Sequence, residues 1–171
     1  MTDKRLPAIL SPGDGSPCRL RLCDARDLDR LRAWKNANRA FFFHKAEISE
    51  EQQRAWFAAY AARADDHMYM IEEAEGADWV SVGVAGVRYL RGEKVLDAYN
   101  IMRGERTVAN RTNMGRCFRL LCDTASEAYG MPVSCKVLVT NPALEWYKHL
   151  GFRCAETTPE YELLVDGART E

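Results

Sequence analysis

A long amphipathic helix, predicted at residues 114–129, constrains the fold more than any other feature of the sequence. Gly130 and Pro132 follow the helix and end it. An apolar face of this length has to be covered by a second layer, and the partner that we expect is a sheet. The apolar side chains recur at the intervals that place them on one helix face: Met114, Cys117, Phe118, Leu121, Cys122, Ala125, Ala128 and Tyr129.

Short apolar or alternating segments predict the strands of that sheet. They lie between turn-rich or charged links such as EAEGAD and RGE. The predicted strands are at about 18–23, 67–72, 80–89, 94–102 and 132–139, with a final strand or hairpin at 152–166.

Capping signals predict the remaining helices. Asp24 with Asp27, and Ser49 with Gln52, stand in the register of a capping box. A third, short helix is expected within residues 141–151. The order of elements, β-α-α-β-β-β-α-β-α-β, predicts an α/β (α+β) fold with a mixed, mostly antiparallel central sheet flanked by helices.

The length of 171 residues is that of one domain. Residues 1–17 carry three of the six prolines and two glycines, and we predict a flexible N-terminal arm there. Residues 18–168 are predicted to form a single domain.

Charge and composition exclude several classes of function. A net charge of −1 argues against a nucleic-acid partner, which usually selects a basic face. No apolar run is long enough to span a bilayer, so we expect no membrane partner and a cytoplasmic location.

Metal binding is not expected. The cysteines lack the C-x2-C spacing of common zinc sites, and three scattered histidines do not form a metal site. No secretory leader is apparent, so reduced thiols acting as small apolar side chains are predicted. The six cysteines are Cys18, Cys23, Cys117, Cys122, Cys135 and Cys154.

The segment NPALEWYKHLGF, residues 141–152, contains a helix start, a tyrosine and a helix stop. Asn141 can cap the helix, Pro142 suits its first position and Gly151 suits its end. A helix held at both ends fixes the direction of Tyr147. The alternative is a tyrosine that only packs.

The order of elements over residues 18–166, together with this segment, resembles the GNAT superfamily of N-acetyltransferases, which use acetyl-CoA. That family's second acetyl-CoA motif is N-x-x-A-x-x-x-Y-x-x-x-G-F. Ala143, Tyr147, Gly151 and Phe152 match it, whereas Asn141 stands six rather than seven residues before the tyrosine. The segment AWKNANR…ISEEQQRAWF also resembles the two-helix segment of the branch that acetylates ribosomal-protein N-termini and amino sugars.

The resemblance implies a phosphate-binding turn before the long helix. The family motif Q/R-x-x-G-x-G/A aligns with NRTNMG, residues 110–115, in which only Gly115 matches and Asn113 replaces the first glycine. Asparagine tolerates positive φ better than most residues. Free backbone N–H groups at a helix start bind phosphates, and the alternative is a surface loop with solvated arginines. The predicted contacts are Arg111, Thr112, Asn113, Met114, Gly115 and Arg116, with Asn141 and Tyr147.

Acetyl transfer to an amine requires that the amine lose a proton. An amine with a pKa of about 10.4 is neutral only to a few parts in ten thousand at pH 7, which corresponds to about 4.6 kcal/mol. A base is therefore expected, and the candidates are Asp97, Tyr99 and His44. By strand alternation, Asp97 and Tyr99 share one face with Val95 and Ile101.

The leaving thiol requires an acid, and the carbonyl oxygen requires a hydrogen-bond donor. The resemblance implies that backbone N–H groups of Asn100, Ile101 and Met102 supply the donor from a bulged strand. Tyr147 is the predicted acid: its usual pKa of about 10 lies above the thiol's 8.5, so donation is uphill by about 2 kcal/mol.

The sequence therefore predicts an N-acetyltransferase that moves acetyl from acetyl-CoA to a primary amine by direct attack in a ternary complex. The acceptor is an amino sugar, a protein N-terminus or another small amine, and a homodimer is possible. The three phenylalanines within 36–47 favour a partly apolar acceptor over a polycation. The alternative is a catalytically silent acyl-CoA-binding or regulatory domain, which Asn110 and Asn113 favour.

Overall fold

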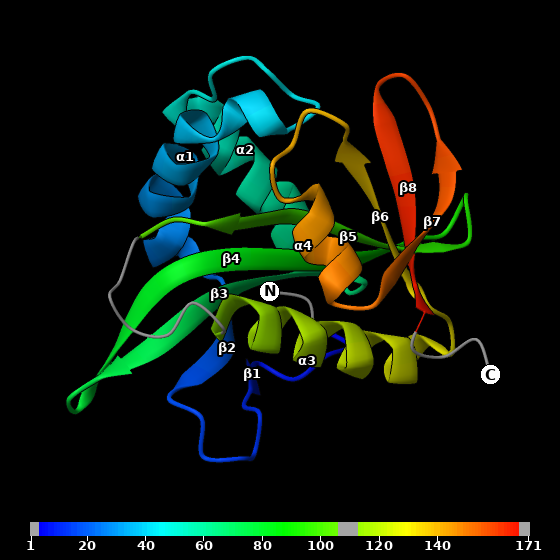
Figure 1. Ribbon diagram of the computed structural model, residues 1–171. Coiled ribbons are helices and arrows are strands. Elements are labelled where there is room, and N and C mark those ends of the chain that lie inside the picture. Colours follow the sequence, from blue (N-terminus) through cyan, green and yellow to red (C-terminus); the bar gives the residue numbers. More distant parts are fainter. Residues whose placement is uncertain (1–3, 106–112, 168–171) are drawn as a thin grey trace.

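The computed structural model describes residues 4–105 and 113–167. Its sheet has eight strands in the order β1-β2-β3-β4-β5-β6-β8-β7, and β5 and β6 are the one parallel pair among these neighbours. The prediction of a mixed, mostly antiparallel sheet flanked by helices is confirmed (Figure 1). The strands are β1 (Ile9–Leu10), β2 (Cys18–Leu22), β3 (Asp66–Glu75), β4 (Asp78–Leu90), β5 (Val95–Arg103), β6 (Val133–Leu138), β7 (Phe152–Thr157) and β8 (Tyr161–Asp166).

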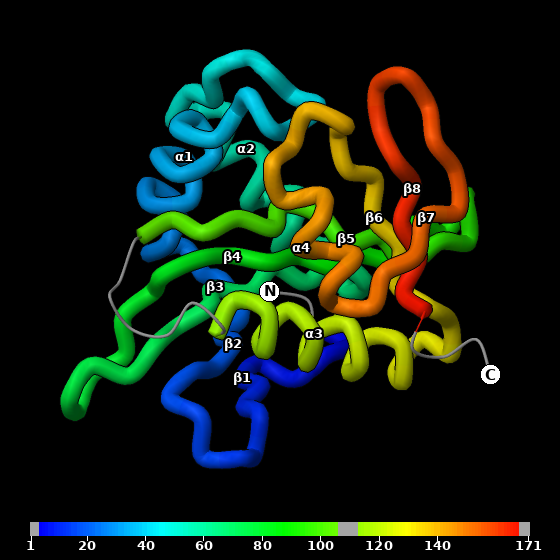
Figure 2. Tube along the Cα trace, in the orientation of Figure 1, coloured from blue at the N-terminus to red at the C-terminus, as the bar shows by residue number. Residues whose placement is uncertain are grey.

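Helices cover both faces of the sheet (Figure 2). They are α1 (Leu28–Ala37), α2 (Glu50–Ala61), α3 (Asn113–Tyr129) and α4 (Leu144–His149). The α1–α2 pair lies on one face and α3 on the other, as both views show. α4 packs beside α3, since Phe118 of α3 contacts the rings of Trp146 and Tyr147 at centroid distances of 5.7 and 5.9 Å.

Two apolar clusters hold these layers together. The larger joins the sheet to the inner face of α3, where Cys117, Phe118 and Leu121 are fully buried. The smaller joins the opposite face to α1 and α2 through Leu31, Trp34 and other side chains. The predicted apolar series of α3 is therefore the face that packs on the sheet, and burial of each large side chain stabilises the fold by about 2 kcal/mol.

The two predicted capping boxes are present. Ser49 caps α2 and its Oγ accepts a bond from the Gln52 N–H at 3.2 Å, while Gln52 accepts from the Ser49 N–H. Asp24 and Asp27 form the same arrangement at a 3₁₀ turn that leads into α1.

The predicted flexible arm differs from the structure over residues 4–10. Leu6 is 3% exposed, β1 pairs with β2, and Lys4 Nζ donates to the carbonyls of Arg63 and Asp66 at 2.7 Å each. Proline and glycine indicate turns, but they do not show whether the apolar residues between those turns are buried.

All six cysteines are free, and five of them are buried. None of the four helices in the described ranges is long and apolar enough to cross a membrane. Those ranges also hold no group of three or more side chains placed to bind a metal ion.

Candidate active site

The site lies where β5 and β6 diverge. Their parallel register covers two pairs, Leu96 with Val133 and Asp97 with Ser134. Beyond these pairs a cavity of about 880 Å³ opens, and it is lined from both faces of the sheet. Lys35 and Trp56 contribute from the α1–α2 side, and Tyr147 contributes from α4.

A β-bulge in β5 faces this gap. Gly86 pairs with Tyr99 and Val84 with Met102, so Ala85 stands opposite two residues, Asn100 and Ile101. Asn100 has φ +52°, which asparagine tolerates better than most side chains. The bulge that the resemblance implied is therefore present, and the donor role of Asn100, Ile101 and Met102 stays a prediction.

The bulge also reverses the alternation of β5. Leu96 and Ala98 lie in the cluster under α3, but beyond the bulge Ile101 packs against that cluster while Met102 joins the cluster under α1 and α2. The prediction that Ile101 shares a face with Asp97 and Tyr99 is wrong, because the extra residue shifts the two-residue period by one.

Tyr147 lines the large cavity and is 4% exposed. Its ring packs edge-on against Phe118 and Phe152, with centroids 5.9 and 6.2 Å away. Its hydroxyl makes no hydrogen bond to another described residue. Burial raises the pKa of Tyr147, with smaller contributions from Cys135 and Cys122. The phenol therefore stays protonated, and it is a weaker acid than an exposed tyrosine.

The helix that carries Tyr147 begins later than predicted. The cap residue is Ala143, and Asn141 instead closes the preceding turn, where its Oδ1 accepts from the Ala143 N–H at 2.9 Å. The Asn141 Nδ2 donates to the Phe41 carbonyl at 3.3 Å, which ties α4 to the loop after α1. Gly151 ends the helix with φ +98°, as predicted.

Asp97 lines the large cavity but is engaged by Arg88. Arg88 Nη2 and Nε lie 2.9 and 3.0 Å from Asp97 Oδ2. Burial raises the pKa of Asp97, and the Arg88 ion pair opposes that shift. Asn100 is three positions after Asp97, which is about 10 Å along a strand. Asp97 therefore stands apart from the bulge.

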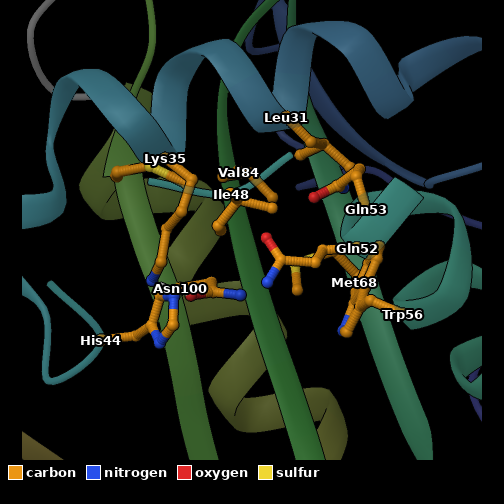
Figure 3. Close-up of a pocket in the computed structure, with 11 residues that line it drawn as sticks. Leu31, Lys35, His44, Ile48, Gln52, Gln53, Trp56, Met68, Val84 and Asn100 are labelled. Carbon is orange, nitrogen blue, oxygen red and sulfur yellow. Dashed lines mark hydrogen bonds between the residues drawn. The ribbon is translucent and has the colours of Figure 1, made fainter. Parts of the chain in front are cut away.

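Tyr99 and His44 complete the predicted candidates for a base. The Tyr99 hydroxyl donates to Asp66, and burial raises the pKa of Tyr99 well above its usual value. His44 lies on the exposed loop before α2 and lines both cavities of the site. Figure 3 shows His44 beside Asn100.

The predicted phosphate contacts divide into two groups. Arg111 and Thr112 lie outside the described residues. Asn113 is fully buried and its Nδ2 donates to Glu73 at 3.1 Å, while Met114 and Gly115 are also buried. Arg116 is exposed beside Asp14 at 3.9 Å. The side chains of Asn113–Arg116 line neither cavity, and phosphate binding by their backbone stays a prediction.

Lys35 was missed by sequence reasoning. Its Nζ donates to Asn100 Oδ1 and lies 3.2 Å from the centroid of the Phe42 ring. Burial lowers the pKa of Lys35 to about 7. Within the described chain, no carboxylate pairs with it. A lysine on an amphipathic helix gives no signal of this environment, because Phe42 and Asn100 reach it only in the folded protein.

A second, smaller cavity of about 300 Å³ adjoins the large one between α1, α2 and the sheet. Five side chains line both cavities and form the boundary between them: Lys35, His44, Ile48, Trp56 and Asn100. The site thus has a long cleft between β5 and β6 and a compact side pocket, with the bulge at their junction.

Solved structures share the fold of this chain. A domain from Methanocaldococcus jannaschii matches with a TM-score of 0.74 and 20% identity, over 88% of this chain and 99% of that chain. A nucleotide-linked sugar GNAT, FdhC, matches with 0.72 and 13% over 88% and 86%. Spermidine N-acetyltransferase from Vibrio cholerae, in complex with CoA and spermine, matches with 0.70 and 14% over 87% and 92%.

No protein-family profile matches this sequence, and no curated protein matches it. At identities of 13–20% the structural likeness shows the fold alone. The chain has the fold of the GNAT N-acetyltransferases.

Proposed function

We propose that the protein is a GNAT-family N-acetyltransferase that moves acetyl from acetyl-CoA to a primary amine in a ternary complex. The observation that carries this proposal is the junction itself. A bulged β5, a buried phenol and a half-buried amine meet one cavity at the divergence of β5 and β6. Each serves a requirement of acyl transfer: a main-chain donor, a proton donor and a basic nitrogen.

The large cavity suits a long, partly apolar ligand such as the pantetheine arm of acetyl-CoA. Its walls combine apolar side chains such as Val137 and Leu163 with backbone at the edges of two diverging strands. Unpaired strand edges offer N–H and C=O groups to a ligand chain. A neighbour of the same fold is a CoA complex, which supports this assignment. Acetyl-CoA supplies the thioester.

The chain's own residues would handle two protons. The amine forms a C–N bond to the acetyl carbon as the C–S bond breaks, so the amine loses one proton and the departing sulfur gains one. Tyr147 holds a proton at the cavity wall for the sulfur. Lys35 donates to Asn100, and His44 lines both cavities with it. These two precede Asp97 as candidates for the base because Arg88 occupies that carboxylate.

The same proposal includes a cytoplasmic location, a small amine as partner rather than a nucleic acid or membrane, and possible homodimers. The near-neutral net charge of −1 supports an amine acceptor over a polyanion.

The second candidate is a silent acyl-CoA-binding domain. Its specific support is Asn113, which replaces a motif glycine and is held by Glu73. Calorimetry with acetyl-CoA and with CoA, followed by a free-thiol assay on a panel of amines, separates the candidates. Binding with turnover supports the enzyme, binding without turnover supports the silent domain, and no binding to either ligand refutes both.

A further inference from the structure

The side pocket has an apolar wall with a few polar side chains. It lies between α1, α2 and the strands β3–β5, and it holds about 300 Å³. Pockets of this size take small ligands. Figure 3 shows the side chains converging on this space. The apolar wall consists of Leu31, Ile48, Trp56, Met68, Val84 and Met102.

Charge is distributed unequally in this pocket. Lys35 and His44 lie with Asn100 at one end (Figure 3), and no Asp or Glu is among the lining residues. A ligand with several positive charges would have to leave water without a carboxylate to pair with. The wall therefore disfavours a polyamine and accepts an apolar group.

Gln53 lies at the end of the side pocket opposite Asn100. This residue is 7% exposed, and its side-chain amide has no hydrogen-bond partner among the described residues, although it lines the pocket. Figure 3 places Gln53 beside Leu31, away from Asn100. Buried amides are normally hydrogen-bonded, so an open one facing a cavity points to a polar group on a ligand.

We propose that this pocket is the acceptor subsite and that the acceptor is a small monoamine: an apolar chain or ring with one amino group and, at its far end, one hydrogen-bonding group. The assignment rests on the proposed acetyltransferase function. The amino group lies at the Asn100 end because the bulge adjoins the large cavity there, and the far group meets Gln53.

Three probe amines test this order of preference. Tyramine has the amine, the ring and a hydroxyl, 2-phenylethylamine lacks the hydroxyl, and spermidine carries additional charges. We expect kcat/KM for tyramine to exceed that for 2-phenylethylamine by about fivefold, which is the effect of one neutral hydrogen bond. It should exceed that for spermidine by roughly 100-fold, because extra charge is buried unpaired. Equal or higher values for spermidine would overturn the proposal.

Gln53→Met keeps the side-chain length and removes the amide. In this variant the fivefold preference for tyramine over 2-phenylethylamine should disappear. Unchanged acetyl-CoA affinity and far-UV circular dichroism show that the variant is folded. A preference for tyramine that survives in the folded variant places the hydroxyl elsewhere and refutes the role of Gln53.

Titration of the same amines into the free protein tests the pocket without acetyl-CoA. Tyramine binding that is weakened by Gln53→Met supports the subsite even if no acetyl group is transferred, which separates its outcome from that of the proposed function. Absence of both binding and turnover with all monoamines refutes it. A tripeptide that begins with tyrosine is a further probe. If its kcat/KM is higher than that for tyramine, the acceptor is a protein N-terminus and the proposal of a small monoamine is wrong.

Discussion

The α4 side and the α1 side of the junction, where the two cavities meet at the β5 bulge, hold their side chains differently. On the α4 side, Tyr147 is placed by one continuous segment, from the turn at Asn141 to the stop at Gly151. On the α1 side, Lys35 is placed by partners 7 and 65 residues away, the Phe42 ring and the Asn100 amide. The position of a side chain that a local segment fixes can be predicted from the sequence pattern. The position of one that distant residues fix cannot.

The two sides also hold their reactive groups in opposite ways. Burial raises the pKa of Tyr147, so the phenol stays protonated, and it lowers the pKa of Lys35 to about 7, so the amine becomes neutral above that pH. A neutral phenol can donate a proton and a neutral amine can accept one. One apolar junction thus holds a protonated phenol and an amine that titrates near neutral pH, and no carboxylate of the described residues pairs with the amine.

Removal of the phenol is expected to have the largest effect. Tyr147→Phe should lower kcat by about 10²-fold with KM changed little, because the departing sulfur loses its proton donor while the ring packing remains. Because its pKa is raised, Tyr147 is a weaker acid than a tyrosine with the usual pKa of about 10. The measurement is steady-state acetylation of the best amine in the panel.

Tyr161→Phe is the matched control for this variant. Tyr161 also lines the large cavity, where its ring meets Phe43 edge-on at 5.9 Å. This control should retain kcat within about twofold. Equal losses in both variants, or none in Tyr147→Phe, would remove the proposed difference between the two sides.

Removal of the buried amine should have a smaller effect that depends on pH. If Lys35 accepts the proton, kcat/KM rises as pH increases through about 7, where Lys35 becomes neutral. Lys35→Met should abolish that rise and lower kcat/KM about tenfold at pH 8. His44→Gln is the control, since His44 is the other basic side chain at this end of the pocket. The other titratable groups nearby are Asp97 and Tyr99 of β5, which interact with Arg88 of β4 and Asp66 of β3.

The same variant has a predicted effect on stability. Lys35 has a folded pKa of about 7, below the usual 10.4, so between these values the unfolded chain binds more protons. The free energy of unfolding should therefore rise with pH from about 7 to 10. Lys35→Met should flatten this rise and be more stable than the parent below pH 7, by roughly 1–3 kcal/mol. Parallel denaturant curves in both proteins would contradict the burial of Lys35.

The bulge that joins the two sides gives a still smaller effect. Asn100→Ala should destabilise the protein by about 1 kcal/mol relative to Asn100→Gly, because alanine disfavours the positive φ that glycine adopts freely. Both variants remove the acceptor of the Lys35 bond, so their difference isolates the backbone. Urea denaturation of the pair measures it, and equal stabilities would indicate that the backbone there does not require positive φ.

Sequence reasoning recovered the parts of the molecule that depend on local order. The α3 face, both capping boxes and the Gly151 stop follow from residue spacing within one turn or a few turns. The packing of Leu6 and the shift of the α4 cap from Asn141 to Ala143 depend on what the rest of the chain places beside them. Those neighbours are brought together by the tertiary structure, and no periodic pattern in the sequence indicates them.

The roles predicted for the site residues stay predictions, whereas the fold is confirmed. Tyr147, Asn141, Asp97, Asn100, Ile101 and His44 do line one cavity, although they come from separate segments. Strand alternation failed at Ile101 because one extra residue in β5 reverses the two faces. Gln53 was predicted only as part of an amphipathic helix, since an amide on such a helix shows its missing partner only after folding.

The smallest effect on kcat is expected at Asp97. It tests whether the base lies on the α1 side of the junction or on β5. Asp97→Asn should change kcat less than about twofold, because Arg88 occupies the carboxylate and about 10 Å of strand separates it from the bulge. The ion pair is partly buried, so its loss should instead lower stability by about 1 kcal/mol. Steady-state kinetics and urea denaturation on one preparation measure both quantities. A large fall in kcat at unchanged stability would transfer the base from the α1 side of the junction to β5 itself. Lys35 would then be a buried amine without a part in proton transfer.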